Sequence, residues 1–301
     1  MTFASFMELA LYHPTIGYYR RERSRIGYDP GTDFFTASTS GPIFGELVAA
    51  ACVTLLGETD PREFCFVELG AESAGGVLAG VAHPFGGART LRIGEPAILT
   101  GRCIVFSNEL FDAQPFHRFV FRRGAWRELG VMLCDGALAE VELPTTTPAR
   151  LPSGAPDGYT IDAPLPATAL ARQIAAQPWT GLLVACDYGK SWRELTEVTP
   201  AGTARAYHRH TQSNDLLARP GEQDLTCHVC WDWLTEALAQ RGFAAPTVES
   251  QEAFFVHHAA ELIAAISSAE AARFSQKKLA LLQLLHPAHL GQKFQVLHAR
   301  R

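Results

Sequence analysis

Short apolar runs without polar alternation recur along the chain, and polar residues or glycine follow each of them directly. Residues 63–70, 103–106 and 181–186 are such runs, which are typical of strands buried on both faces of a parallel sheet. Apolar residues at helical spacing predict helices over residues 3–11 and 42–56. The pattern therefore indicates an α/β fold built around a doubly covered sheet.

After Pro115 the apolar spacing changes to every second residue. Two turn signals, Arg123-Gly124 and Asp135-Gly136, divide this stretch into three runs, over residues 116–121, 125–134 and 137–143. Such dipeptides between alternating runs mark tight hairpins. We expect an antiparallel β-meander inserted over residues 116–145. Further along, residues 253–256 are apolar and predict a strand, and a helix is expected from residue 267 to about residue 285.

Polar side chains cluster where two of the buried runs end. Asn108, Glu109 and Asp112 follow the run at residues 103–106, and Asp187 follows the run at residues 181–186. In open α/β sheets, ligands bind beyond the carboxyl ends of the strands. Acids and an amide at such an edge suit a cationic or amine-bearing substrate. The alternative is that these residues only satisfy backbone donors in turns.

Composition narrows the function further. The chain has 301 residues, 47% hydrophobic and 19% charged, with a formal charge of −5. A single domain over residues 1–301 is expected, and the negative charge argues against a nucleic-acid partner. No apolar run is long enough to span a membrane. Seven scattered cysteines favour reduced thiols and a cytoplasmic location. Cys227-x-x-Cys230 lacks partners at zinc-site spacing, so no metal site is expected.

Several motifs, in the same order, resemble those of the MidA-like family, which includes the mitochondrial complex I assembly arginine methyltransferase. The stretch NELFDAQP at residues 108–115 resembles the family's NE-x-x-DA-x-P signature. Other matching segments are Gly17-Tyr18-Tyr19, Thr32 to Ala37, Phe44-Gly45-Glu46, Asp187-Tyr188-Gly189, Gly202 to Tyr207 with His210, and Asp224 to Val229. The resemblance implies a class I methyltransferase fold, S-adenosyl-L-methionine as cofactor and a protein arginine side chain as acceptor.

The resemblance also implies roles for individual residues. The first 60 residues would form an N-terminal arm and lid. The residues expected to bind the cofactor are Asp33, Glu68, Gly70, Gly75, Glu95 and Asn108. The residues expected to hold the acceptor guanidinium or to take part in catalysis are Glu109, Asp112, Asp187 and His210. His210 would position the target or accept a proton, unless it is a hydrogen-bonded structural histidine.

Two departures from the family pattern support an alternative function. The family places glycines after Gly70, but here Glu72 and Ala74 occupy those positions. A glycine allows close backbone approach to a ligand, whereas a larger residue adds bulk. Residues 83–101 are also too few for a second strand and a full crossover helix. The chain could therefore be a methyltransferase-fold protein that has weakened cofactor binding and acts as a binding or assembly factor.

Overall fold

The computed structural model describes residues 1–21, 25, 27, 29, 31–33, 37–73, 75–144, 150–269 and 275–301, without the side chains of residues 38 and 39. The chain forms two compact units. The sheet unit comprises Phe35–Leu110, Ala171–Tyr188 and Thr235–Arg301, and the meander unit comprises Met1–Phe34, Phe111–Leu170 and Gly189–Leu234.

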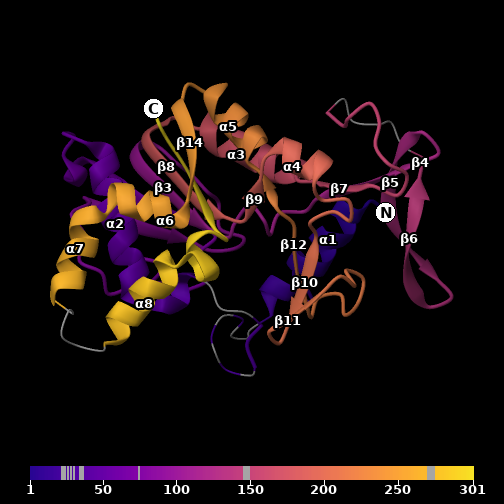
Figure 1. The fold of residues 1–301 in the computed structure, drawn as a ribbon, viewed down its shortest axis with the longest axis horizontal. Coiled ribbons are helices and arrows are strands. Elements are labelled where there is room, and N and C mark those ends of the chain that lie inside the picture. Colours follow the sequence, from indigo (N-terminus) through magenta and orange to yellow (C-terminus); the bar gives the residue numbers. More distant parts are fainter. Residues whose placement is uncertain are drawn as a thin grey trace. The chain divides into compact units, whose positions relative to one another are not determined.

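Six strands make the sheet of the sheet unit, in the order β14-β15-β8-β3-β1-β2 (Figure 1). Their bounds are β1 Cys65–Leu69, β2 Gly87–Leu91, β3 Gly101–Asn108, β8 Trp179–Asp187, β14 Ala244–Ser250 and β15 Gln295–Arg300. Strands β2, β1, β3 and β8 pair in parallel, and β15 runs antiparallel to both of its neighbours. The carboxyl ends of β1, β3 and β8 therefore meet at one edge of the sheet.

Helices cover one face of this sheet through a continuous apolar core. They are α2 Pro42–Leu56, α6 Gln251–His258, α7 Ala260–Ala269 and α8 Gln276–Leu285, with short helical turns at Ala37–Ser40, Pro61–Glu63 and Pro287–Gly291. Phe44 of α2 and Phe254 and Phe255 of α6 are fully buried in this core, against Phe66 and Phe106 of the sheet. Aromatic packing of this kind supplies much of the apolar burial that stabilises an α/β layer.

The links between the first three strands contain no helix in the residues that the structure describes. β1 connects to β2 through turns, and residues 92–100 join β2 to β3 directly. A crossover with its helix needs at least about 10–12 residues, so the short second link agrees with the expectation from residues 83–101. Strand β2 is correspondingly an edge strand, with two of its five residues exposed and the other three partly buried.

The meander unit contains the predicted antiparallel insertion. Its sheet has the order β6-β5-β4-β7, with β4 His117–Arg122, β5 Ala125–Cys134, β6 Ala137–Leu143 and β7 Thr160–Ala163. At both hairpins, Arg123-Gly124 and Asp135-Gly136, the two turn residues have positive φ values between 50° and 81°. This is the backbone geometry of the hairpin turn that the sequence predicted. The hairpin predictions are therefore confirmed.

Smaller elements complete this unit. Helix α1 Phe3–Tyr12 packs on β5 and β4, and a three-stranded sheet has the order β11-β10-β12. The remaining bounds are β9 Gly189–Lys190, β10 Arg205–His208, β11 Thr211–Ser213, β12 Asp224–Thr226, β13 Val229–Cys230, α4 Trp192–Glu197 and the short helix η1 Tyr18–Arg20. Helices α3 Leu165–Ala176 and α5 Trp231–Ala239 each have residues in both units.

One predicted element is wrong. Residues 253–256 lie inside helix α6, which begins at Gln251 after the N-cap Ser250. The Ser250 hydroxyl accepts the backbone N–H of Ala253, so the chain leaves β14 and enters the helix without a loop. Of the helix predicted from residue 267 to about residue 285, residues 267–269 belong to α7 and residues 276–285 to α8, and residues 270–274 lie outside the described residues.

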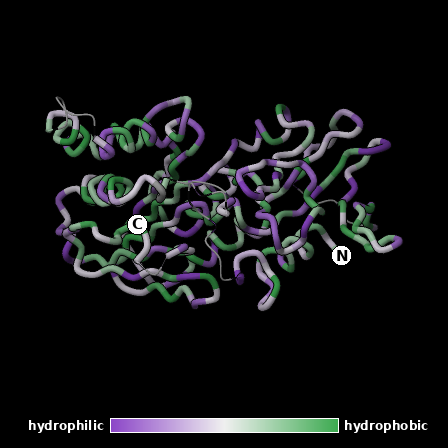
Figure 2. The backbone as a smooth tube through the Cα atoms, turned by 90° about the horizontal axis from the view of Figure 1, so that it is seen from below, coloured by the Kyte–Doolittle hydropathy of each residue, from purple (hydrophilic) through white to green (hydrophobic). Residues whose placement is uncertain are grey.

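Apolar and polar residues are interspersed along the chain, and Figure 2 shows this as short hydrophobic segments interrupted by hydrophilic ones. Among the described residues, no helix combines the length and the apolar character needed to span a membrane. All seven cysteines are free thiols.

Candidate active site

The edge of the sheet at the carboxyl end of β1 is built around Gly70. This residue has φ +76°, a conformation that side-chain-bearing residues rarely adopt, and a Cβ there would lie 2.8 Å from Leu110 Cδ1. The N–H groups of Gly70 and Ala71 both donate to the carbonyl of Leu91 at the end of β2. A glycine is therefore required for the tight turn that leaves β1, and the predicted role of Gly70 in cofactor binding stays a prediction.

The side chain of Glu68 makes a hydrogen bond to the loop that follows β1. Its side chain is only 7% exposed, and its Oε2 accepts the N–H of Val77 at 2.6 Å. Burial raises the pKa of Glu68 to about 7, against the opposing effect of the Val77 hydrogen bond. The carboxyl group therefore fixes the loop, and the assignment of Glu68 to the cofactor stays a prediction.

The glycine that this arrangement requires is Gly76, not Gly75. Gly76 has φ +59°, and a Cβ there would overlap Glu68 Oε2 and the Thr90 methyl group. Gly75 has no positive φ and would meet only the Cβ of Ala79, at 2.8 Å. The second essential glycine of this loop thus makes room for a buried carboxylate. Ala74 lies outside the described residues.

Glu95 lies in the link between β2 and β3. It is exposed, and its Oε2 accepts the N–H of Arg92 at 2.7 Å. This hydrogen bond closes the turn after β2, which is the ordinary role of a turn acid. Glu95 is close to the end of β2, where a ribose-binding acid would be expected, and its assignment to the cofactor stays a prediction.

Asn108 and Glu109 stand at the carboxyl end of β3. Glu109 has φ +52°, an uncommon backbone conformation for a residue with a side chain. Its N–H donates to the carbonyl of Cys186 on β8, and its Oε1 accepts Asn108 Nδ2 at 3.0 Å. Asn108 Oδ1 is buried and accepts no hydrogen bond from the described residues. Strained backbone and an unsatisfied buried acceptor are features found at binding sites.

Asp187 ends the neighbouring strand β8. Asn108 pairs with Cys186 in the parallel ladder, so Glu109 and Asp187 directly follow the last paired residues of adjacent strands. Asp187 is fully buried, and its Oδ1 accepts the N–H of Tyr188 at 2.8 Å. Burial and the nearby negative charges of Asp187 and Glu109 raise the pKa of the Cys186 thiol well above its usual value. Two acids, Glu109 and Asp187, thus lie at the ends of neighbouring strands, a residue type that suits a cationic ligand.

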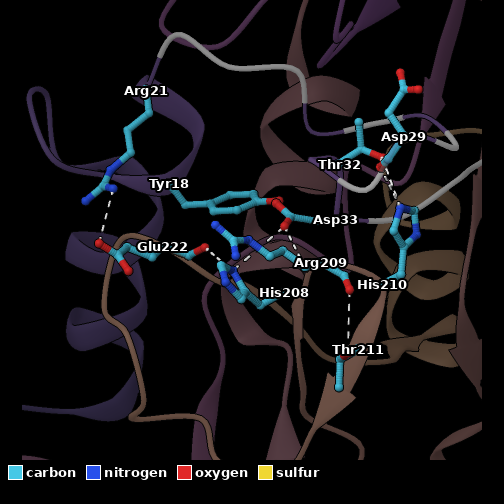
Figure 3. A network of polar contacts seen from close by, with 10 residues as sticks. All are labelled: Tyr18, Arg21, Asp29, Thr32, Asp33, His208, Arg209, His210, Thr211 and Glu222. Carbon is cyan, nitrogen blue, oxygen red and sulfur yellow. Dashed lines mark hydrogen bonds and ion pairs between the residues drawn. The ribbon is translucent and has the colours of Figure 1, made fainter.

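The meander unit holds Asp33 at the centre of a separate polar network (Figure 3). Asp33 is fully buried and accepts the hydroxyl of Tyr18 at 2.7 Å and the N–H of Arg209 at 2.8 Å. His208 Nδ1 lies 3.8 Å from its carboxylate. These contacts connect Asp33 to Tyr18, to His208 in strand β10 and to Arg209, which follows that strand. Sequence reasoning had not found Tyr18 and Arg209 as partners, because they lie far from Asp33 in the chain.

His210 belongs to the same network. Its N–H donates to the Asp33 carbonyl at 2.8 Å, and its Nε2 lies 3.0 Å from Thr32 Oγ1 and 3.2 Å from the Asp29 carbonyl. Arg209 and His210 form the turn between β10 and β11 with positive φ values of 48° and 60°. The structure thus brings Asp33 and His210 together, and their ring and carboxylate contacts hold the loop. Their cofactor-binding and catalytic roles stay predictions.

Asp112 also lies in the meander unit. It is 3% exposed, and its carbonyl accepts the N–H of Cys227 at 3.1 Å.

His228 is the residue after Cys227, and burial lowers its pKa to about 4. His228 is therefore neutral near pH 7, which excludes a role as a charged acid there.

Comparison with known proteins identifies the family to which the chain belongs. A family model described as "Putative S-adenosyl-L-methionine-dependent methyltransferase" matches residues 93–248, which is more than half of the chain. No curated protein sequence matches the chain.

Two solved structures from Burkholderia thailandensis share the fold. The first, bound to S-adenosyl-homocysteine, has a TM-score of 0.87 and 24% identity, and the match covers 100% of this chain and 88% of the other. The second, a native structure of the same superfamily, has a TM-score of 0.81 and 24% identity over 100% and 87% of the two chains. They confirm the predicted methyltransferase-type α/β fold. The chain belongs to the family of S-adenosyl-L-methionine-dependent methyltransferases that this model describes.

Proposed function

We propose that this protein transfers a methyl group from S-adenosyl-L-methionine to the guanidinium of an arginine side chain in a protein. S-adenosyl-L-methionine, the cofactor that the family description names, would supply an electrophilic methyl group when bound. Methyl transfer to a nitrogen nucleophile requires mainly alignment and charge complementarity from the protein. The arginine acceptor rests on the resemblance to the MidA-like family and on the charge of the sheet edge.

The observation that carries the proposal is the negative edge at the ends of β3 and β8. Glu109 is partly exposed and its backbone is held in a left-handed conformation by the Cys186 carbonyl. It is therefore the residue that we assign to direct contact with the acceptor. Asp187 is fully buried behind that edge, so we assign it a positioning role, through the negative potential it adds. A planar guanidinium matches a carboxylate in shape and charge.

We also propose that the cofactor binds at this edge of the sheet, next to the acceptor. Asn108 Oδ1 is a buried acceptor that no described residue satisfies, and a ligand with an N–H or O–H group would satisfy it. Gly70 leaves the end of β1 without a side chain next to Leu110. Asn108, Gly70 and the loop held by Glu68 are the cofactor-binding residues that we propose. Gly75, Glu95 and Asp33 are secondary cofactor-binding candidates from the sequence. Asp112 and His210 are secondary candidates for holding the acceptor or for catalysis.

The alternative of a binding or assembly factor without methyl transfer is not favoured. It was based on two departures from the family pattern, the missing glycines after Gly70 and the short segment of residues 83–101. The link between β2 and β3 is indeed short, but the loop after β1 has glycines at Gly70 and Gly76, and the matching family model describes a methyltransferase. The seven free thiols are consistent with action in a reducing compartment such as the cytoplasm.

The test is methyl transfer from isotopically labelled S-adenosyl-L-methionine to a protein extract, with N-methylarginine identified by mass spectrometry. We expect N-methylarginine with the unmodified chain and at least a 100-fold lower rate with Glu109→Gln. Glu109→Gln should still bind S-adenosyl-homocysteine, because its proposed role concerns the acceptor. The exposed Glu8→Gln on α1 serves as the control and should not change the rate. Label found only on lysine or on small molecules would overturn the arginine acceptor.

A further inference from the structure

Three histidines converge on one carboxylate at the other side of the sheet unit. Glu249 lies on the edge strand β14, His298 on β15, and His257 and His258 in the last turn of α6. The Nε2 atoms of His258 and His298 each lie 3.0 Å from the same oxygen, Glu249 Oε1. His257 Nδ1 contacts the other carboxylate oxygen. None of these residues belongs to the proposed methyl-transfer site.

We propose that Glu249, His258 and His298 form a binding site for a divalent transition metal, with Zn²⁺ as the preferred ion. One ligand atom from each of the three residues lies within 4.8 Å of the other two. Two ligands bonded to one Zn²⁺ at about 2.0–2.1 Å in tetrahedral geometry are roughly 3.3 Å apart. The two separations between nitrogen and oxygen, 3.0 Å each, are close to this value, and the two imidazole nitrogens lie within 4.8 Å of each other.

The ligand set determines the class of metal. Two imidazoles and one carboxylate suit Zn²⁺ and neighbouring first-row ions, whereas Mg²⁺ and Ca²⁺ prefer oxygen ligands throughout. Three protein ligands leave one tetrahedral position for water. Coordination through Nε2 would place the proton of each neutral imidazole on Nδ1.

The backbone holds the three side chains in place before any metal binds. Glu249 pairs with Val296 and His298 pairs with Thr247, so Glu249 and His298 are diagonal neighbours on the same face of the antiparallel ladder. Helix α6 follows β14 directly from the N-cap Ser250 and brings His258 back to this face. A preformed site lowers the conformational entropy lost on binding.

A buried aromatic ring supports both imidazoles. Phe254 is fully buried, and its ring centroid lies 5.1 Å from that of His258 and 5.6 Å from that of His298. The side chains of Glu249, His258 and His298 are 15%, 19% and 13% exposed. The site is thus open enough for an ion to enter and covered enough to hold the side chains in one arrangement.

The test is metal binding by the full chain after treatment with a chelator. We expect one equivalent of Zn²⁺ per chain by isothermal titration calorimetry and metal analysis, with no comparable heat from Mg²⁺. His298→Gln and Glu249→Gln should each weaken Zn²⁺ binding at least about tenfold. Both replacements keep a side chain able to form hydrogen bonds. His289→Gln, at an exposed histidine of the same unit, is the matched control and should bind Zn²⁺ like the unmodified chain.

A second measurement does not depend on the variants. Co²⁺ in place of Zn²⁺ should give a visible spectrum of nitrogen and oxygen coordination without the intense thiolate band that bound cysteines produce. The absence of stoichiometric Zn²⁺ binding, a thiolate band, or unchanged affinity in correctly folded His298→Gln and Glu249→Gln would each overturn the site. His257→Ala then shows whether the third histidine is a ligand or a hydrogen-bond donor.

Discussion

At the scale of single residues, the most informative feature is the conformation of Glu109. Its left-handed backbone, with φ +52°, is uncommon for a residue with a side chain and costs free energy. A glycine would adopt the same conformation without this cost. The retention of a charged side chain here therefore points to a role outside folding. No pattern in the sequence reveals a positive φ at a glutamate, although its acidic side chain at a strand end could be predicted.

Glu109→Gly should separate stability from activity. We expect the free energy of unfolding, measured by urea denaturation, to be about 0.5–1 kcal/mol higher for this variant than for the unmodified chain, because the backbone strain is relieved. Methyl transfer should fall at least 100-fold. The control is Arg123→Gly on the β4–β5 hairpin, where φ is also +52°. It should gain similar stability and keep full activity. A Glu109→Gly variant that retains methyl transfer would refute the role given to this carboxylate.

Glu68 should make stability depend on pH. Its pKa is about 7 in the folded protein, against an ordinary value of 4.5, so the folded state binds more protons between these values. The contribution of Glu68 to stability is therefore largest below about pH 4.5 and falls as the pH rises to about 7, by about 3 kcal/mol in total.

The pH prediction is checked against Glu68→Gln, which has no titrating group and can still accept the Val77 hydrogen bond. Urea denaturation at pH 5 and pH 8 gives the difference in unfolding free energy between the two proteins. This difference should shift in favour of Glu68→Gln at pH 8 by between 1 and about 3 kcal/mol. An equal difference at both pH values would show that Glu68 is not a buried carboxyl group with a raised pKa.

At the scale of elements, the loop after β1 shows how much the sequence could predict. The strand, its glutamate and Gly70 were identified from the sequence, and the structure agrees. Gly75 was chosen over Gly76 as the second glycine, since the sequence does not show which residue faces the Glu68 carboxylate. Residues 253–256 were assigned to a strand because a short apolar run is ambiguous by periodicity alone. Because of this wrong assignment, the sequence did not show that His257 and His258 lie at the end of a helix that packs against β14.

Gly76→Ala should destabilise the loop more than its backbone conformation alone explains. Its Cβ would displace the Glu68 carboxylate and break the Val77 hydrogen bond, for a total cost of about 2–4 kcal/mol in unfolding free energy. Gly80→Ala has a similar positive φ, +70°, but no atom within 4 Å of the new Cβ, so it should cost about 1 kcal/mol. Equal losses for the two variants, measured by thermal or urea denaturation, would contradict the packing role of Gly76.

At the scale of the whole molecule, the buried strands β1, β3 and β8 could be predicted from short apolar runs, and the hairpins from turn dipeptides. The order of the strands in the sheet could not be predicted in this way. The network around Asp33 and the cluster around Glu249 could not be predicted in the same way. Each joins residues separated by tens to more than a hundred positions, and only the tertiary fold brings them together. The resemblance that predicted a methyltransferase rests on motifs spread over most of the chain, whereas the proposed acceptor rests on the acids at one edge of the sheet.

The most direct test of the central claim is hydrogen–deuterium exchange of the full chain with and without saturating S-adenosyl-homocysteine. The cofactor is proposed to bind at the carboxyl ends of β1 and β3. Amides in residues 68–77 and 107–110 should therefore exchange more slowly with the ligand, while residues 251–258 of α6 should not change. No binding at millimolar ligand, or binding without protection in these two segments, would contradict the account.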